Sequence, residues 1–274
     1  MSQEQLQPVY INKILKEKNP SLYRWTPPFL LNYLKRIIHQ DYLNKFIESA
    51  KDKYGADFAQ AYVEFADIKV ELIGEENLPK TNDRVIFAGN HPLGGLDGIA
   101  LMDVLGHRYP NIKFMVNDIL MYMLNLRSLF LPINKHGGQG RDAVRLIQDS
   151  FASDVPIFVF PAGLVSRRNK GVIKDLKWGK NFIANAIKHQ RDIIPMHISG
   201  ENSKFFYALS AWRKRLGIKA NLEMLYLVDE AWKNNGIKLT ITIGERIPYT
   251  TFTREKSRED WAADLREHVY ALVE

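Results

Sequence analysis

The feature that most constrains the fold of this sequence begins at Ile68, where short runs of β-branched residues alternate with stretches of helical periodicity. The runs that predict strands are Ile68–Ile73, Val85–Ala88, Ile112–Val116, Val155–Phe160, Ile193–Ile198, Leu222–Val228 and Lys238–Ile243. The stretches that predict helices are Ile99–Gly106, Arg141–Phe151, Gly179–His189, Lys204–Leu216 and Ser257–Val273. Such alternation predicts an α/β fold with a mixed, largely parallel sheet flanked by helices.

The first 67 residues have helical periodicity but few strand signals. One apolar stripe runs from Phe29 to Ala50 and a second from Ala56 to Ala66. The segment from Lys18 to Gln40 has no acidic residue and mixes aromatic side chains with cations, as a helix in a membrane interface does. The same pattern fits a helical layer packed on the main domain, with its charges in solvent. We expect an N-terminal helical, membrane-contacting segment over residues 1–67 and an α/β domain over residues 68–274.

The charge and cysteine content limit the chemistry. The 274 residues include 38 Lys and Arg against 31 Asp and Glu, so the net charge of +7 favours an anionic partner. Nucleic acid, a membrane surface and an acidic protein all fit that charge, but no nucleic-acid-binding motif occurs, so we expect no nucleic-acid partner. Because there is no cysteine, thiol nucleophiles and cysteine-ligated metals are excluded. The scattered histidines form no close ligand pairs, and we expect no metal site.

Targeting signals are also missing from the sequence. Residues 1–8 have neither a basic region nor an apolar run of the kind that begins a secretory signal. No stretch of about 18 uninterrupted apolar residues occurs, which argues against a spanning helix. We expect a cytoplasmic protein that associates peripherally with the inner face of the cell membrane.

The loops that follow predicted strands are where ligands of an open α/β sheet gather. The first such loop carries Asn90, His91 and Asp97 on a glycine-rich turn before a helix. In that arrangement the carboxylate accepts the proton of one ring nitrogen, while the other nitrogen faces a substrate as a base. The alternative is a capping aspartate beside an ordinary hydrogen-bonded loop histidine.

Three further segments have similar positions. Phe160-Pro161-Ala162-Gly163 leaves a strand and is followed by Ser166, Arg167 and Arg168, so exposed N–H groups and two guanidinium groups lie within reach of an anion. A polar, glycine-rich loop from Leu131 to Arg141 contains Lys135. The predicted strand Ile193–Ile198 carries Pro195.

Taken in order, these segments resemble the four motif blocks of the glycerophospholipid acyltransferase family, typified by lysophosphatidate acyltransferase. The family has an Asn-His-x4-Asp block, a Phe-Ile-x-Arg block, a Phe-Pro-Glu-Gly-Thr-Arg-Ser block and a Val-Pro block. The corresponding residues here are Asn90-His91 with Asp97, Ile133-Asn134-Lys135, Phe160 to Gly163 with Ser166-Arg167, and Ile194-Pro195. The resemblance covers about residues 68 to 250.

The departures from the family pattern concern the spacing and the cations. Five residues separate His91 from Asp97, so the Gly94-Gly95 pair must absorb one extra residue. Lys135 replaces an arginine, Ala162 replaces the glutamate and Val165 replaces the arginine of the third block. Those third-block residues help the family bind a glycerol phosphate acceptor. The pattern looks like a divergent, haemolysin-like branch with a His-x5-Asp motif, which includes acyltransferases that complete ornithine or glycine lipids.

The resemblance implies an O-acyltransferase in lipid metabolism that moves a fatty acyl group from a thioester to the hydroxyl of a lysolipid. With no cysteine and no Gly-x-Ser-x-Gly elbow, we expect direct transfer, with His91 as base, Asp97 as its partner and loop N–H groups around the oxyanion. The donor is acyl carrier protein or coenzyme A, and no cofactor is needed. The residues expected to contact substrate are Asn90, Gly94, Gly95, Lys135, Phe160, Pro161, Gly163, Ser166, Arg167, Arg168 and Pro195. Two alternatives remain: a 1-acylglycerol-3-phosphate acyltransferase of phospholipid biosynthesis, or a catalytically inactive lipid-binding relative.

A second acid-free segment lies between Asn202 and Leu222, where five cations alternate with aromatic side chains. Such a surface can meet an acidic carrier protein or anionic lipid headgroups. It can equally be the solvated face of a helix.

Overall fold

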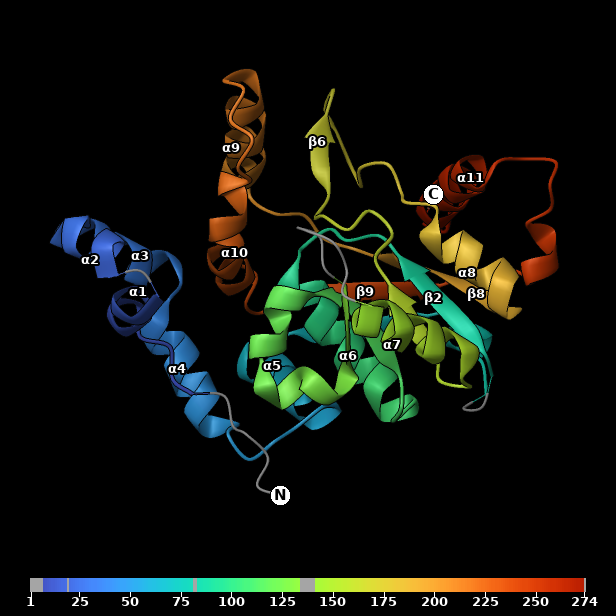
Figure 1. Cartoon of the computed structure of the whole chain (residues 1–274), viewed down its shortest axis with the longest axis horizontal. Coiled ribbons are helices and arrows are strands. Elements are labelled where there is room, and N and C mark those ends of the chain that lie inside the picture. Colours follow the sequence, from blue (N-terminus) through green and yellow to red (C-terminus); the bar gives the residue numbers. More distant parts are fainter. Residues whose placement is uncertain (1–6, 19, 81–82, 134–140, 274) are drawn as a thin grey trace.

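The computed structural model describes residues 7–18, 20–80, 83–133 and 141–273, and it is built around a mixed, mostly parallel sheet (Figure 1). The seven strands lie in the order β1-β9-β8-β2-β5-β3-β4. Their bounds are β1 Lys69–Ile73, β2 Val85–Gly89, β3 Lys113–Asn117, β4 Phe130–Ile133, β5 Ile157–Val159, β8 Asp192–Ile198 and β9 Lys238–Ile243. Strands β8, β2, β5, β3 and β4 run parallel, whereas β9 is antiparallel to β8 and carries β1 parallel to itself. This confirms the predicted fold class.

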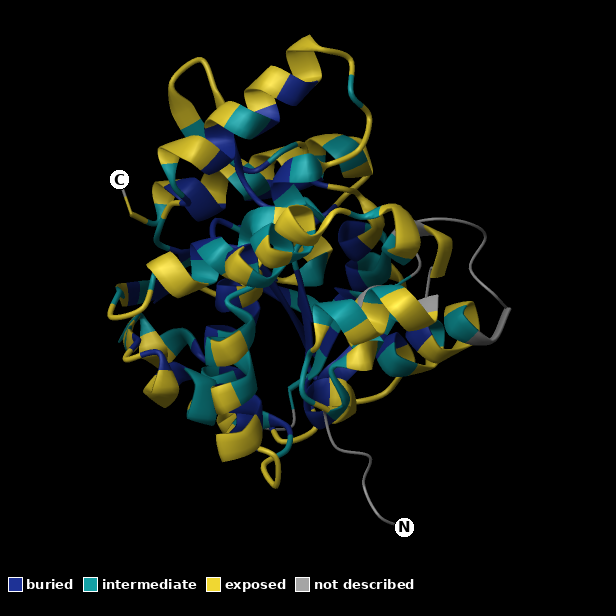
Figure 2. Cartoon of the chain, turned by 90° about the vertical axis from the view of Figure 1, so that its left-hand side faces the viewer, coloured by how far each residue is buried: buried dark blue, intermediate teal, exposed yellow. Residues whose placement is uncertain are grey.

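Helices cover both faces of the sheet because the side chains of the central strand β2 alternate between two hydrophobic clusters. Val85 and Phe87 point into the cluster shared with α4, α5 and α6, whereas Ile86 and Ala88 point into the cluster shared with α7, α8 and α11. The bounds are α4 Gln40–Ser49, α5 Ala56–Phe65, α6 Gly95–Arg108, α7 Arg141–Ala152, α8 Asn181–His189 and α11 Arg258–Ala271. Figure 2 shows buried residues along the sheet and the inner helix faces, with the outer helix faces exposed.

The N-terminal layer is helical, as expected, but the predicted helix from Phe29 to Ala50 is two helices. Its elements are α1 Ile11–Lys18, α2 Pro20–Trp25, α3 Pro28–Ile37 and then α4. The break falls at His39, whose φ of 46° is left-handed and therefore ends a right-handed helix. The expected division near residue 67 crosses a continuous core, since Phe46 and Phe58 belong to the same cluster as the strands. Among the described residues, no helix has the length and apolarity needed to cross a membrane.

The prediction of a strand over Leu222–Val228 is wrong. This segment forms a short 3-10 helix, η4 Leu222–Tyr226, and the start of α10 Leu227–Lys233. A short apolar run has no periodicity that separates strand from helix, and here Glu223 is turned inward to meet two arginines. The other predicted strands are confirmed, and so is the helix at Lys204–Leu216, which is α9 Lys204–Arg215. The remaining short 3-10 turns are η1 Glu75–Asn77, η2 Asp118–Tyr122, η3 Leu124–Leu129 and η5 Tyr249–Thr251.

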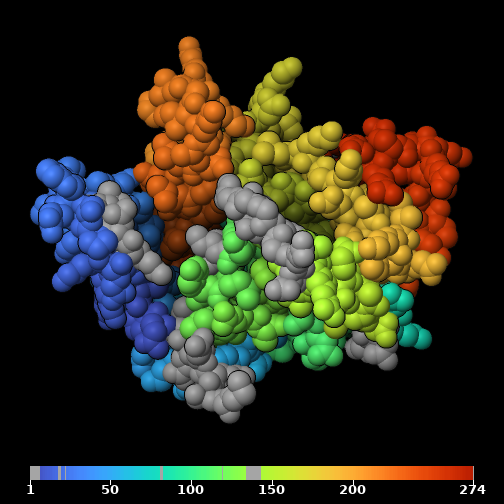
Figure 3. All heavy atoms as spheres, viewed as in Figure 1, coloured from blue at the N-terminus to red at the C-terminus, as the bar shows by residue number. Residues whose placement is uncertain are grey.

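The sequence prediction missed strand β4 and a hairpin. The hairpin consists of β6 Arg167–Asn169 and β7 Val172–Lys174, in antiparallel register. Its two-residue turn is Lys170-Gly171, with φ values of 47° and 86°, which is the geometry that suits tight hairpins. Each strand has three residues, which is too short for a pattern search, and β6 consists of polar residues only. In the space-filling view the hairpin and α9 project from the same side of the molecule (Figure 3).

Candidate active site

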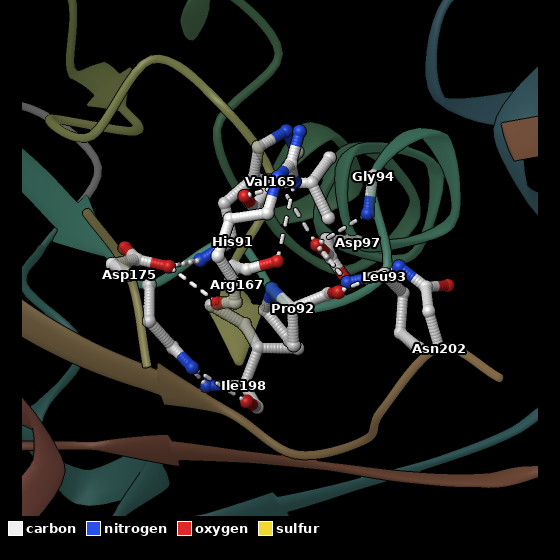
Figure 4. A network of polar contacts seen from close by, with 12 residues as sticks. His91, Pro92, Leu93, Gly94, Asp97, Val165, Arg167, Asp175, Ile198 and Asn202 are labelled. Atoms are coloured by element: carbon white, nitrogen blue, oxygen red, sulfur yellow. Dashed lines mark hydrogen bonds and ion pairs between the residues drawn. The ribbon is translucent and has the colours of Figure 1, made fainter. Parts of the chain in front are cut away.

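The candidate base and its carboxylate partner meet where β2 ends and α6 begins (Figure 4). Nδ1 of His91 lies 2.9 Å from Oδ2 of Asp97, and Asp97 is fully buried. The same carboxylate accepts the backbone N–H groups of Leu93 and Gly94 at 2.9 to 3.2 Å. Asp97 therefore caps the N-terminus of α6 and also holds the ring of His91, a geometry compatible with both interpretations of this aspartate.

This arrangement defines which ring nitrogen is free. Burial raises the pKa of Asp97, and the hydrogen bonds from His91 and from the two N–H groups partly offset that rise. Ionised Asp97 is an acceptor only, so Nδ1 of His91 must donate to it, and Nε2 keeps its lone pair. The His91 side chain is 17% exposed, so part of it is accessible to a reactant. The pair can therefore act as a general base.

The two glycines of the loop have different roles. Gly94 has a φ of 87°, and a Cβ there would lie 3.1 Å from Leu227 and 3.3 Å from Val165. The positive φ and the close packing therefore require glycine at this position of the loop. A Cβ on Gly95 would have no neighbour within 4 Å. Because the Leu93 and Gly94 N–H groups are bound to Asp97, they are not available as the expected oxyanion donors.

Phe160 supports one face of the His91 ring. The two rings stack with centroids 3.9 Å apart and an angle of 24° between their planes. This contact arises because β2 and β5 are neighbouring parallel strands, so the residues after their carboxyl ends meet. The turn behind Phe160 is closed by a hydrogen bond from the Gly163 N–H to the Phe160 carbonyl, 2.9 Å long. The Pro161 carbonyl accepts the Gly179 N–H at 2.9 Å, which fixes the turn to the start of α8.

Ser166 attaches the third block, residues 160–168, to the loop that carries His91. Its N–H donates to the His91 carbonyl at 2.7 Å, and its hydroxyl donates to Oδ1 of Asp175 at 2.6 Å. Oδ1 of Asp175 also accepts the His91 N–H at 3.1 Å. Sequence reasoning missed Asp175. The hairpin pairing of Arg167 with Lys174 places Ser166 opposite Asp175, so a recognised Lys170-Gly171 turn was the signal that could have found it.

The two arginines after Ser166 are in unlike surroundings. Arg167 is buried, donates to the carbonyl groups of Val165 and Ser166, and lies 2.8 Å from Glu223. Burial lowers the pKa of Arg167, although the carboxylate of Glu223 partly offsets the effect. The structure thus favours a packing role for Arg167 over substrate contact. Arg168 is exposed, with its guanidinium 5.5 Å from the centre of the Tyr207 ring, and remains available to an anion.

Other expected contact residues are built into the sheet. Asn90 is buried, and its amide accepts the N–H of Ile198 at 2.7 Å and donates to its carbonyl at 2.9 Å, joining the ends of β2 and β8. Pro195 is buried within β8, where its carbonyl accepts the Gly244 N–H at 2.8 Å. These contacts indicate that Asn90 and Pro195 shape the site without facing it. Lys135 lies outside the described residues.

Asn202 is a further residue that sequence reasoning missed. It follows β8 and donates to the Pro92 carbonyl at 3.0 Å, so it supports the His91 loop from a third strand end. In the part of the chain that the structure describes, no group of three or more His, Asp or Glu residues lies close enough to hold a metal ion.

Known proteins that are similar to this chain are acyltransferases. The family model described as Acyltransferase matches residues 13–274. The chain is 46% identical over 99% of its length to the lyso-glycine lipid O-acyltransferase of Bacteroides thetaiotaomicron, all of which is covered. It is 49% identical over 96% of its length to the enzyme of the same name from Phocaeicola vulgatus, 94% of which is covered.

A solved structure has the same fold. It is the 1-acyl-sn-glycerophosphate acyltransferase PlsC of Thermotoga maritima, with a TM-score of 0.51 and 16% identity over 96% of this chain and 95% of that one. At that identity the likeness concerns the fold alone. The family match and the two close relatives confirm the resemblance drawn from the motif blocks, and the chain belongs to the acyltransferase family.

Proposed function

We propose that this acyltransferase moves a fatty acyl group from a thioester donor to the hydroxyl of a lyso-glycine lipid, completing an amino-acid lipid. The observation that carries the proposal is the His91–Asp97 pair, 2.9 Å apart, in a chain 46% and 49% identical to two enzymes named for that acceptor. The intact pair argues against the alternative of a catalytically inactive lipid-binding relative.

The mechanism follows from the free lone pair on Nε2 of His91. Nε2 removes the proton of the acceptor hydroxyl as its oxygen attacks the thioester carbonyl, and Asp97 stabilises the imidazolium that forms. The tetrahedral intermediate collapses, the carbon–sulfur bond breaks, and the imidazolium returns the proton to the leaving thiolate. The products are an ester and a free thiol, and His91 is neutral again. Acid–base catalysis of this kind contributes about 10²–10⁴-fold in rate.

The third block favours a carboxylate acceptor over a phosphate. At the position where the family has an arginine, Val165 is buried against Phe206 and Leu227, and Arg167 is paired with Glu223. Among the described residues of the third block, Arg168 is then the exposed cation. One guanidinium suits a singly charged glycine carboxylate better than a dianionic phosphate. This weakens the alternative of a 1-acylglycerol-3-phosphate acyltransferase.

The test is a transfer assay with purified protein. Acyl-coenzyme A and acyl carrier protein thioesters are each offered with lyso-glycine lipid or lysophosphatidate, and the products are identified by mass spectrometry. We expect the diacylated glycine lipid to form at least tenfold faster than phosphatidate, and the faster thioester identifies the donor. Transfer only to lysophosphatidate, or equal product with the His91→Ala variant, contradicts the proposal.

The proposal includes a membrane surface as partner, because the acceptor is a lipid. Trp25 at the end of α2 is 83% exposed and Phe29 in α3 is 74% exposed, beside the exposed Arg24. Trp212 of α9 is 56% exposed beside Lys214 and Arg215, which are also exposed. Aromatic side chains next to cations are what interfacial binding to anionic lipids requires.

The exposed aromatic surface of α2 and α3 is joined to that of α9 through one contact region. The hydroxyl groups of Tyr33 in α3 and Tyr226 in η4 are 2.5 Å apart, and Nε2 of His39 lies 2.7 Å from Asp229 in α10. Figure 1 shows α3 facing α10, with α2 and α9 further from this contact. These contacts support docking of both surfaces on one membrane.

Vesicle sedimentation tests this part. With phosphatidylglycerol vesicles, we expect Trp25→Ala with Phe29→Ala to weaken binding, whereas Ile73→Ala, an exposed apolar control on the edge strand β1, leaves it unchanged. Equal binding of all three proteins contradicts this part of the proposal.

A further inference from the structure

Asp175 directly follows β7 and is 3% exposed, and its two carboxylate oxygens accept three hydrogen bonds. Oδ1 accepts the backbone N–H of His91 at 3.1 Å and the hydroxyl of Ser166 at 2.6 Å. Oδ2 accepts the indole N–H of Trp178 at 2.8 Å. One oxygen therefore holds His91 and the third block together (Figure 4), and the other joins them to the segment before α8.

The position of Asp175 is itself fixed by α11. Its N–H donates to the hydroxyl of Tyr270 at 2.7 Å, and its carbonyl accepts from Arg266 at 2.5 Å. On the other side, the hairpin register places Asp175 opposite Ser166. Because α11 and the hairpin both hold its backbone, the carboxylate is a rigid reference point for the His91 loop.

We propose that Asp175 is a positioning residue for the acyl transfer, which sets the distance between the His91 base and the third block through its shared Oδ1. The proposal rests on the proposed role of His91 as base. Asp175 acts through the His91 backbone and through Ser166, whereas Asp97 acts on the ring. The two aspartates thus fix different parts of the same histidine.

The site requires a carboxylate. A carboxylate has two acceptor oxygens and can serve all three donors, whereas an amide has one acceptor oxygen and one donor NH₂ group. An asparagine at position 175 therefore places its NH₂ group against either the indole N–H of Trp178 or the backbone N–H of His91. That N–H group then faces a donor and has no acceptor. An unpaired buried donor is costly, so the loop shifts. A displacement of about 1 Å costs up to about 10²-fold in rate.

The experiment compares Asp175→Asn with a matched control. Asp192 starts β8 at the opposite end of the parallel strands from the site, where it accepts the Tyr249 N–H at 2.8 Å and the Arg246 Nε–H at 2.7 Å. We expect Asp175→Asn to lower kcat about 10- to 100-fold with KM for both substrates within about twofold. Asp192→Asn should leave kcat unchanged. Circular dichroism sets an assay temperature at which each variant is folded.

A second variant separates positioning from stability. Trp178→Phe removes the donor at Oδ2 but leaves both bonds at Oδ1, so it lowers stability and largely keeps kcat. In that background Asp175→Asn can turn its oxygen towards His91 and Ser166. We therefore expect the double variant to have a higher kcat than Asp175→Asn alone, although it carries more destabilising changes.

Hydrogen exchange gives a readout that does not depend on activity. Loss of the bond to Oδ1 should speed amide exchange in the segment 90–95 of Asp175→Asn, but not in Asp192→Asn. Unchanged kcat and unchanged exchange in Asp175→Asn overturn the positioning role, and so does a change confined to KM. If wild-type protein acylates no glycine lysolipid, the proposed function fails, and the exchange result still decides whether Asp175 holds the loop.

Discussion

The guanidinium of Arg167 lies 2.8 Å from the carboxylate of Glu223, with both side chains buried, and Arg213 reaches the same carboxylate at 2.9 Å. Burial acts to raise the pKa of Glu223, but the hydrogen bond from Arg213 and the charges of both arginines dominate, so the pKa lies below its ordinary value. A single carboxylate thus ties β6 to η4 and α9.

We predict that Arg167→Ala mainly reduces stability. Removing one partner of a buried ion pair costs about 3–5 kcal/mol, because the remaining charge loses its compensation. Arg213 still neutralises Glu223, so the lower end of this range is expected. Urea unfolding measures the change. The prediction is wrong if the free energy of unfolding stays within about 0.5 kcal/mol of wild type and KM rises. Arg167 would then bind substrate, as first expected from the sequence.

Arg168→Ala should have the opposite profile. Its guanidinium is exposed and contacts the Tyr207 ring, so we expect little change in the free energy of unfolding. If Arg168 binds the acceptor carboxylate, KM for the lysolipid rises about tenfold, as loss of a charge-assisted hydrogen bond implies. Steady-state kinetics with varied acceptor test this. An unchanged KM for both substrates removes Arg168 from the site.

These two arginines show how far the sequence could be read. Adjacent in the sequence and identical in type, they were expected to share one role. The difference between their roles depends on Glu223, which lies 56 positions from Arg167 in a segment predicted as a strand. A buried ion pair between distant segments leaves no local pattern, whereas His91 and Asp97 lie six positions apart on one strand–turn–helix unit. The local pair was therefore predictable from spacing and the distant one was not.

The same distinction applies to the fold. The sheet strands other than β4 were predicted from their apolar and β-branched runs, because parallel strands buried on both faces have that composition. The hairpin that carries Asp175 was missed, since its strands have three residues each and include Arg167, Arg168 and Asn169. Asp175 itself bonds to His91 across 84 positions. Its role depends on tertiary structure alone.

For the catalytic pair, we predict that Asp97→Asn lowers kcat about 10²–10⁴-fold. An amide in place of the carboxylate supplies one acceptor oxygen, and the Leu93 and Gly94 N–H groups compete for it. The ring of His91 then loses its fixed tautomer and the charge that stabilises the imidazolium. His91→Ala should abolish transfer while the protein stays folded by circular dichroism. Near-native turnover in either variant refutes the general-base mechanism.

The last prediction concerns His197 in β8, whose ring meets the Tyr270 ring edge to face with centroids 5.6 Å apart. Burial lowers the pKa of His197 to about 4, and its Nδ1 is buried without a hydrogen-bond partner among the described residues. Between the ordinary pKa of about 6.5 and the folded value, the unfolded chain binds more protons at this position than the folded chain. The free energy of unfolding therefore falls as the pH decreases through that interval, by at most about 3 kcal/mol from this residue.

Urea unfolding of wild type and His197→Met between pH 4.5 and 7 tests this prediction. Methionine cannot be protonated and fills a similar volume, so the variant should lose that part of the pH dependence and become relatively more stable at low pH. His189 provides a comparison, because burial and nearby cations also lower its pKa, so His189→Met should likewise lose a part of the pH dependence. If His197→Met has the same pH dependence as wild type, protonation of His197 does not limit stability in acid.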